Sequence, residues 1–306
     1  MSLTAQLDAI TLKKIVPKMF DAIFDSNPLL KKIMASGQYV SQNGGLTIDI
    51  PLNYATTSAS GWYTGADTLD TTDNQNITSA SYDWKNIYAN ITMAEEDKLK
   101  NAGNLGVVKL LASKAMIAEK TLKDSLGTGL YSDGTDAKSI VGLRDIVATD
   151  QTVGGIDQSA NSFWQGNVDS TTTTLSLSAM NTQFENASVD NEVPDFCPTT
   201  RAIYNLYYNL LQPQQRFMDK DQAKGGFTSL MFNSAPLVVD SHVPASHLFM
   251  LNSKHLWLYY HPERNIKAMP FSKPINQEVL VSRVLWMGAF GSSNNRFHAL
   301  LSAITA

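Results

Sequence analysis

The residues best suited to chemistry in this chain of 306 residues are five histidines and one cysteine. None of the spacings among the histidines is that of a helix-borne metal pair; they are His242, His247, His255, His261 and His298. With a single cysteine the chain cannot form an internal disulfide, and we interpret Cys197 as a small buried thiol. The sequence contains no phosphate-cradling glycine loop ending in lysine, no His-Glu-x-x-His and no Gly-x-Ser-x-Gly. The pattern predicts a protein that is not an enzyme and has no catalytic residues, no metal site and no cofactor.

Two further clusters have simpler structural explanations. Glu95, Glu96 and Asp97 follow Thr92 in the spacing of a capping box, where the helix dipole favours negative charge. The tyrosines from Tyr204 to Tyr208 have helical spacing without basic neighbours, which favours a core or interface over base stacking.

Composition excludes several classes of protein. The formal net charge is −4, and we find no basic stripe of the kind that nucleic-acid binders carry. The hydrophobic fraction of 43% and the charged fraction of 17% are those of a folded globular protein. No secretory signal begins the sequence and no apolar run is long enough for a membrane span, so we expect folding in a reducing cytoplasm and no membrane partner.

A long acidic hairpin followed by a long helix is the main feature of the first half of the chain. Apolar and polar residues alternate over 46–52, a return strand is expected over 78–93, and the span 33–84 contains no Lys or Arg. Such a ribbon could reach roughly 40 Å at about 3.3 Å per residue, and it cannot bury its apolar residues against itself, so we expect it to lie on another molecule. The helix is predicted over 105–126, with Gly127 and Gly129 as its C-terminal stop.

The rest of the chain mixes helices and short strands, which indicates an α+β class. An amphipathic helix is predicted over 12–24, ended by Pro28. Two helices are expected after Ser178 and after Thr199 or Thr200, and strands are expected near 237–239, 248–251, 256–260, 279–290 and 297–304. Residues 291–295 are predicted to be a hairpin turn joining the last two strands. The span 145–200 also lacks Lys and Arg, which suits either a solvated acidic surface or a contact with a basic neighbour.

In the order of these parts, the chain resembles the major capsid proteins of tailed bacteriophages, whose fold is shared with encapsulins and the herpesvirus capsid floor. The resemblance covers nearly the whole chain and depends on fragments in a fixed order. These are the hairpin, the helix ending in Leu126-Gly-Thr-Gly-Leu-Tyr131, then Gly142-Leu-Arg-Asp-Ile-Val147, Val153-Gly-Gly-Ile-Asp157, Pro194-Asp-Phe-Cys-Pro198 and Ala235-Pro-Leu-Val-Val-Asp240.

The resemblance implies four parts and a function. They are an N-terminal arm (1–45), an extended-loop hairpin (46–94), a peripheral domain with a spine helix (95–149 and 246–306) and an axial domain (150–245). The implied function is that of a structural subunit that self-assembles into hexamers and pentamers of an icosahedral phage head around double-stranded DNA. An encapsulin-like compartment and another phage structural protein are the alternatives.

The resemblance also implies partners and a place in the virion. About 40 residues precede the hairpin, so we expect separate scaffolding and portal proteins and no N-terminal processing. Packaged DNA would be contacted weakly and non-specifically, and assembly would take place in the bacterial cytoplasm. Some members of the family link their shells through a lysine on the extended loop, and this loop has none, so a shell without cross-links is predicted.

The expected contact residues between subunits are the aromatic, apolar and acidic side chains of the hairpin and the lysines of the spine helix. They are Trp62, Tyr63, Asp67, Leu69, Asp70, Asp73, Lys109, Lys114 and Lys120. The aromatic and apolar side chains would act as anchors, and the acids would face the lysines of an adjacent copy.

Overall fold

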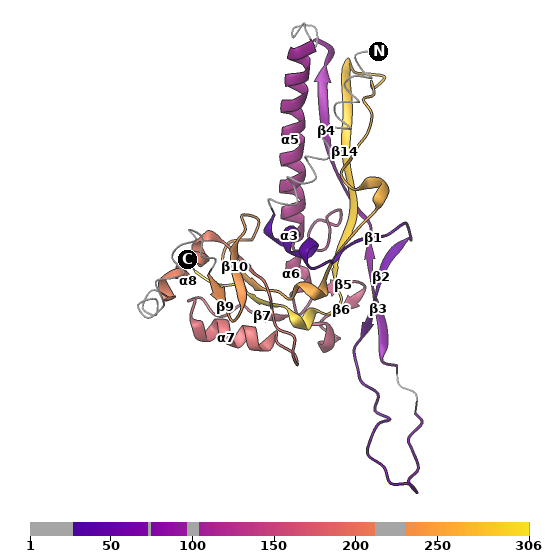
Figure 1. Ribbon diagram of the computed structural model, residues 1–306, viewed down its shortest axis with the longest axis vertical. Coiled ribbons are helices and arrows are strands. Elements are labelled where there is room, and N and C mark those ends of the chain that lie inside the picture. The colour runs from indigo at the N-terminus through magenta and orange to yellow at the C-terminus, as the bar shows by residue number, and fades with distance from the viewer. Residues whose placement is uncertain (1–26, 73–74, 97–103, 212–229, 306) are drawn as a thin grey trace.

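A computed structural model of the chain describes residues 27–72, 75–96, 104–211 and 230–305, with the side chains of 104–111 outside that description. Strands and helices are both present, which confirms the α+β class. Figure 1 shows an elongated body, a lobe to one side of it and a long loop at its lower end. The helix predicted over 12–24 lies outside the described residues.

The elongated body is built on a five-stranded sheet. Its path is β1-β12-β14-β13, with β4 also paired to β14. The strands are β1 (Tyr39–Ser41), β4 (Lys85–Ala94), β12 (Leu256–Tyr260), β13 (Lys267–Ala268) and β14 (Val279–Ser292). The spine helix α5 (Asn104–Leu130) packs along β4 and buries Ala115, Ala118 and Leu122.

The spine helix is longer at its C-terminal end than the sequence predicts. The helix α5 continues to Leu130, so Gly127 and Gly129 are not the C-terminal stop that the sequence predicts. A Cβ on Gly127 would lie 2.6 Å from the ring of His242, and one on Gly129 would lie 3.2 Å from Ile140. The glycines therefore allow close packing at the end of the helix.

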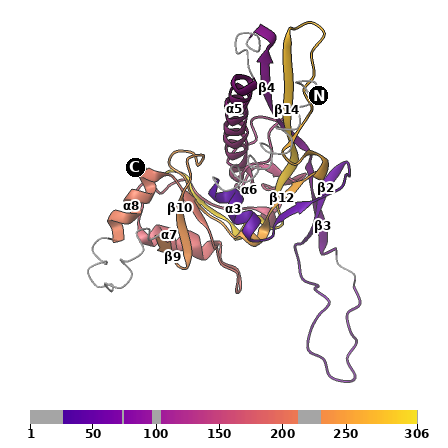
Figure 2. The same ribbon diagram turned by 45° about the horizontal axis from the view of Figure 1, so that its top comes forward.

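The side lobe is built on a six-stranded sheet of order β7-β15-β11-β8-β10-β9. The helices α7 (Leu177–Asn186) and α8 (Arg201–Leu211), both predicted from the sequence, pack on this sheet (Figure 2). Its strands are β7 (Asn167–Asp169), β8 (Cys197–Thr199), β9 (Met231–Phe232), β10 (Ala235–Val239), β11 (Leu248–Met250) and β15 (Ala299–Leu301). The lobe has its own apolar core, which includes Met180, Tyr207 and Leu237.

The sheets correct the expected division of the chain. β11 and β15 lie within 246–306 but pair in the six-stranded sheet, so this segment supplies strands to both sheets. The predicted hairpin turn at 291–295 is wrong for the same reason, since β14 and β15 belong to different sheets. A turn of 3₁₀ helix, η7 (Asn295–Phe297), carries the chain across instead.

The hairpin is shorter than predicted. β2 (Thr47–Asn53) pairs with β3 (Ile77–Asp83), but the second half of the expected return strand is the separate strand β4, which pairs with β14 over ten residues. The N-terminal arm also becomes part of the folded body before residue 45. There Asn27 caps α3 (Pro28–Ala35), and β1 pairs with β12.

Candidate interaction site: the extended loop

The base of the β2–β3 hairpin is fixed to the body. Ile48, Ile50 and Leu52 are buried on one face and belong to the main core, so the partner surface for this part of the ribbon lies in its own chain. The small hairpin of β5 (Thr152–Val153) and β6 (Ile156–Asp157) supports it, because Ser81 donates to the carbonyl of Gly154 at 2.9 Å. On β14, the backbone N–H of Ser292 donates to the Tyr82 hydroxyl at 3.1 Å.

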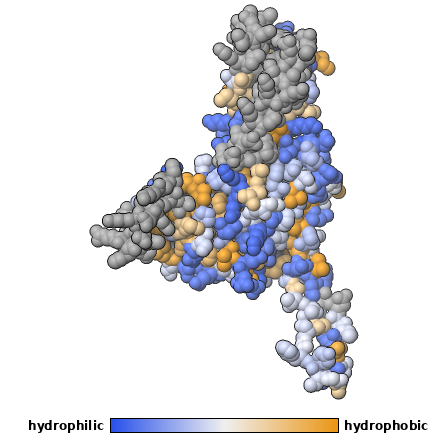
Figure 3. Space-filling view, in the orientation of Figure 1, coloured by the Kyte–Doolittle hydropathy of each residue, from blue (hydrophilic) through white to orange (hydrophobic). Residues whose placement is uncertain are grey.

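The anchored part ends at Tyr54, where the free loop begins. The ring of Tyr54 stacks on Phe163 of the 3₁₀ turn η2 (Ser162–Trp164) at 4.8 Å, and its hydroxyl donates to the carbonyl of Gln75 across the hairpin. Beyond this point the described residues form no strand until Ile77. Figure 3 shows the loop as a narrow projection below the body.

The predicted anchors lie on this projection and are exposed. Trp62 is fully exposed, and Tyr63 and Leu69 are 66% and 57% exposed. A large apolar side chain held in water is unfavourable by about 25 cal/mol per Å² of apolar surface. Several such side chains on one loop mark a contact with another molecule.

The acids of the loop are held in local turns. Asp67 accepts hydrogen bonds from the backbone N–H and hydroxyl of Thr64 at 2.8 and 2.9 Å, and Asp70 accepts the same pair from Thr72 at 2.9 and 2.7 Å. These bonds lower the pKa of both carboxyls, so both acids carry a charge at neutral pH. Asp73 lies outside the described residues.

The spine lysines differ from one another. Lys114 donates to the carbonyl of Thr92 on β4 at 2.7 Å and so ties the helix to its own sheet. Lys120 is exposed, whereas the side chain of Lys109 lies outside the described part. Of the predicted cationic partners, Lys120 is therefore the one the structure presents to solvent.

Sequence reasoning missed an open face on the five-stranded sheet. Along β4 the exposed residues Tyr88, Asn90 and Thr92 alternate with residues buried against α5. On β14 the exposed Arg283 lies between the half-buried Val281 and Leu285. The sequence did contain a signal for this face. Apolar residues occur on both faces of β14, whereas a strand with one face in water normally has polar residues on that face.

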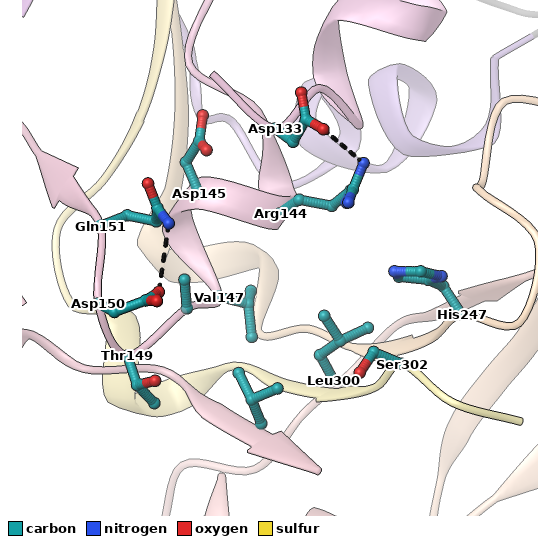
Figure 4. A pocket seen from close by; sticks show the side chains of 12 residues that line it. Asp133, Arg144, Asp145, Val147, Thr149, Asp150, Gln151, His247, Leu300 and Ser302 are labelled. Carbon is teal, nitrogen blue, oxygen red and sulfur yellow. Dashed lines mark hydrogen bonds and ion pairs between the residues drawn. The ribbon is translucent and has the colours of Figure 1, made fainter. Parts of the chain in front are cut away.

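A cavity of about 220 Å³ lies between α6 and the lobe, and its lining is shown in Figure 4. Arg144 on α6 (Leu143–Ile146) is already paired with Asp133 at 3.0 Å. Burial raises the pKa of Asp145 to about 6, and its side chain caps α6 through the N–H of Gly142. No group of three or more potential ligands that could hold a metal ion occurs among the described residues.

The histidines His255 and His298 and the single cysteine have structural roles. His255 pairs with Glu192 at 2.7 Å, and His298 is fully buried. Cys197 is buried, and burial raises the pKa of its thiol to about 12, so it is not a nucleophile near neutral pH. No helix within the described ranges could cross a membrane.

Known structures share this architecture although no protein-family model and no curated protein matches the sequence. The capsid of cyanophage A-1(L) is 16% identical, with a TM-score of 0.63 over 90% of this chain and 93% of that one. The capsid of a native GTA particle is 11% identical, with a TM-score of 0.62 over 90% and 91% of the two chains. The SrpI encapsulin of Synechococcus elongatus is 9% identical, with a TM-score of 0.56 over 89% and 87%.

The chain therefore has the capsid fold found in phage capsid proteins and encapsulins. The predicted resemblance is confirmed at the level of the fold, and it extends over most of the chain.

Proposed function

We propose that this protein is the major capsid subunit of a tailed bacteriophage. Copies would form hexamers and pentamers of an icosahedral shell that encloses double-stranded DNA, and the protein would reside in the virion after assembly in the bacterial cytoplasm. The observation that carries this proposal is a loop with exposed Trp62, Tyr63 and Leu69 on a fold shared with shell proteins. A subunit that stays alone would leave these side chains in water.

The parts of the fold take their roles from this proposal. The five-stranded sheet with α5 would form the peripheral domain, and the six-stranded sheet with α7 and α8 would form the axial domain around the capsomer axes. Separate scaffolding and portal proteins would take part in assembly. The formal charge of −4 suits weak, non-specific contact with packed DNA.

The loop would clasp an adjacent copy over the open face of its β4–β14 ladder. The ladder of ten residue pairs extends about 33 Å at about 3.3 Å per residue, and each limb of the loop, at about 11 residues, can span the same length. Trp62 and Leu69 would cover apolar residues such as Val281 and Leu285. Asp67 or Asp70 would face Arg283, which takes part in none of the ion pairs between described residues.

A charge exchange tests this contact. Asp70→Arg should impair assembly in about 0.1 M salt, and Arg283→Asp in the same chain should restore it, since each exposed pair is worth about 0–1 kcal/mol and many copies act together. Lys120→Asp is the matched control for the spine helix, the site expected from the sequence. Rescue by Lys120→Asp instead of Arg283→Asp would move the contact to the helix. Equal yields for all variants at about 0.1 and 0.5 M salt would refute an electrostatic contribution.

The apolar part of the contact is tested separately with Trp62→Ala. The exposed side chain contributes little to the fold, so the melting temperature should stay within about 1 °C while shell yield falls. Ser60→Ala, another exposed position on the same loop, should assemble normally.

An encapsulin-like compartment is the second candidate, favoured by the likeness to the SrpI encapsulin. Such a shell would contain protein cargo. Nuclease-protected double-stranded DNA in particles purified from infected cells would distinguish the phage head from the compartment.

A further inference from the structure

Besides the long passage from β4 to β7, the chain crosses between the two sheets at two adjacent points. The first crossing joins β11 to β12 through the 3₁₀ turn η5 (Ser253–His255), and the second joins β14 to β15 through η7. The two crossings touch, because the ring of His255 stacks on Phe297 at 4.1 Å and the N–H of Ser293 donates to the carbonyl of His255 at 2.9 Å. They form the joint between the body and the lobe.

Helix α3 lies against the body side of this joint. Asn27 accepts hydrogen bonds from the N–H groups of Leu29 and Leu30 and so starts the helix. Leu29, Leu30 and Ile33 are at most 1% exposed and belong to the core that also contains Leu256 and Leu258 of β12. An apolar face therefore fixes α3 to the five-stranded sheet.

The polar face of α3 reaches the lobe. Lys32 pairs with Asp195 at 2.8 Å, and the N–H of Asp195 donates to the carbonyl of Leu251 directly after β11. Asp195 also accepts from the N–H and the hydroxyl of Ser253 at 2.8 and 2.6 Å, and Ser36 donates to the Ser253 hydroxyl at 2.7 Å. The carboxylate of Asp195, just before β8, thus binds both Lys32 of α3 and Ser253 of the first crossing.

The contacts of the apolar face of α3 are stronger than those of its polar face. The apolar face is buried, whereas the side chains of Lys32 and Asp195 remain 29% and 37% exposed. A partly exposed ion pair shifts an equilibrium by less than about tenfold. A separate buried contact, the hydrogen bond from the hydroxyl of Tyr131, directly after α5, to Asp240 at 3.1 Å, keeps the end of the spine helix on the lobe.

We propose that α3 is a releasable strap, and that the Lys32–Asp195–Ser253–Ser36 contacts set the angle between the two sheets. With the contacts made, body and lobe hold one orientation. With them broken, the lobe turns about the joint while α3 stays on the body. Identical copies in non-equivalent positions of a closed shell would need such freedom. The strap is a property of the single subunit, whatever the protein's function.

The angle can be measured on the soluble subunit with spin labels at Asn90→Cys on β4 and Asn205→Cys on α8, both exposed positions. Cys197 is buried and stays in place. Electron–electron resonance should give one narrow distance distribution for the otherwise unchanged chain. Lys32→Ala and Asp195→Ala should broaden or split it, and Ala35→Ser, at an exposed position of the same helix, should leave it unchanged.

Hydrogen exchange provides the second readout. Asp195→Ala removes the acceptor of the Ser253 N–H, so this amide should exchange about tenfold faster while the amides of β12 keep their protection. The pair Ser36→Cys and Ser253→Cys, tested without spin labels, should form a disulfide that restores slow exchange over residues 252–255 in the Asp195→Ala background.

Two outcomes would overturn the proposal. One is faster exchange at Ser253 with an unchanged distance distribution, which would make the contacts local only. The other is equal broadening of the distance distribution by Ala35→Ser and Lys32→Ala. If Asp195→Ala fails to fold, Lys32→Met, which keeps the apolar stem, gives the same comparison.

Discussion

The stability of this fold should fall as the pH drops below 6.5 because of one buried histidine. His298 is fully buried between the two chain crossings, and its Nδ1 accepts the N–H of Asn252 at 3.3 Å. That bond requires an unprotonated Nδ1 and therefore a neutral ring with its proton on Nε2. Burial lowers the pKa of His298 to about 3, with the nearby His255 as the next cause.

The sign and size of the effect follow from that pKa. The unfolded chain binds a proton at this ring below its ordinary value of 6.5, and the folded chain does not until about pH 3. Stability from the neutral ring is complete above pH 6.5 and is lost as the pH falls toward 3. Between pH 7 and pH 5 the loss is about 2 kcal/mol, at about 1.4 kcal/mol per pH unit below 6.5.

A second buried group acts in the opposite direction. Burial raises the pKa of Asp145 to about 6, so its contribution to stability increases as the pH falls from 6 toward 3.8, the ordinary pKa of an aspartate side chain. The two effects partly cancel between pH 6 and pH 3.8. The measurement must therefore compare two chains over the same pH range.

The assay is urea unfolding followed by tryptophan fluorescence at pH 7 and pH 5, for the unchanged chain and for His298→Asn. Asparagine keeps an acceptor for the Asn252 N–H and does not titrate. The unchanged chain should lose about 2 kcal/mol more than the variant between the two pH values. Equal losses in both chains, or an imidazole nitrogen shift showing that His298 titrates near pH 6, would refute the reasoning.

Three further predictions follow from the packing and the loop. Gly127→Ala should lower stability by about 1–3 kcal/mol in thermal unfolding, because the added Cβ would lie 2.6 Å from the ring of His242; an unchanged melting temperature would contradict this. Cys197 should resist an aromatic disulfide reagent at pH 8 until urea unfolds the chain, and rapid labelling of the native subunit would show the thiol to be accessible. Purified shells should give a single monomer band on a denaturing gel, since the loop carries no lysine, and a ladder of multimers would contradict a shell without cross-links.

Local patterns in the sequence predicted many of the elements well. The apolar stripe of the spine helix, the helix α8 before Pro213 and the alternation of β2 are all present in the structure. These patterns come from one element facing one core, so they can be read within a short window. The fold class was predicted for the same reason.

Pairings between distant segments were not predictable in the same way. Strands β14 and β15 are close in sequence but join different sheets, and a short segment of Gly, Ser and Asn such as 291–295 looks the same in a hairpin and in a crossing. The expected return strand is two strands, β3 and β4, separated at Trp84. The break follows from their different partners, since β3 pairs with β2 and β4 pairs with β14. Pro28 lies in the first turn of α3, a position that proline favours, and the sequence analysis did not predict this helix.

The candidate site was predicted in part. The exposed positions of Trp62, Tyr63 and Leu69 agree with an anchor role, but their contact with another copy stays a prediction. Lys114 shows why single side chains are hard to assign, since it binds the carbonyl of Thr92 within its own chain. Arg283 went unnoticed because its place on an open face depends on the burial of the opposite face by α5.

The most direct test of the central claim is cryo-electron microscopy of particles formed by this chain, alone and with a scaffolding protein. The account predicts closed shells of hexamers and pentamers in which each loop over residues 54–76 lies across the β4–β14 face of an adjacent copy. A soluble monomer under all conditions, or shells in which the loop contacts no neighbouring copy, would contradict it.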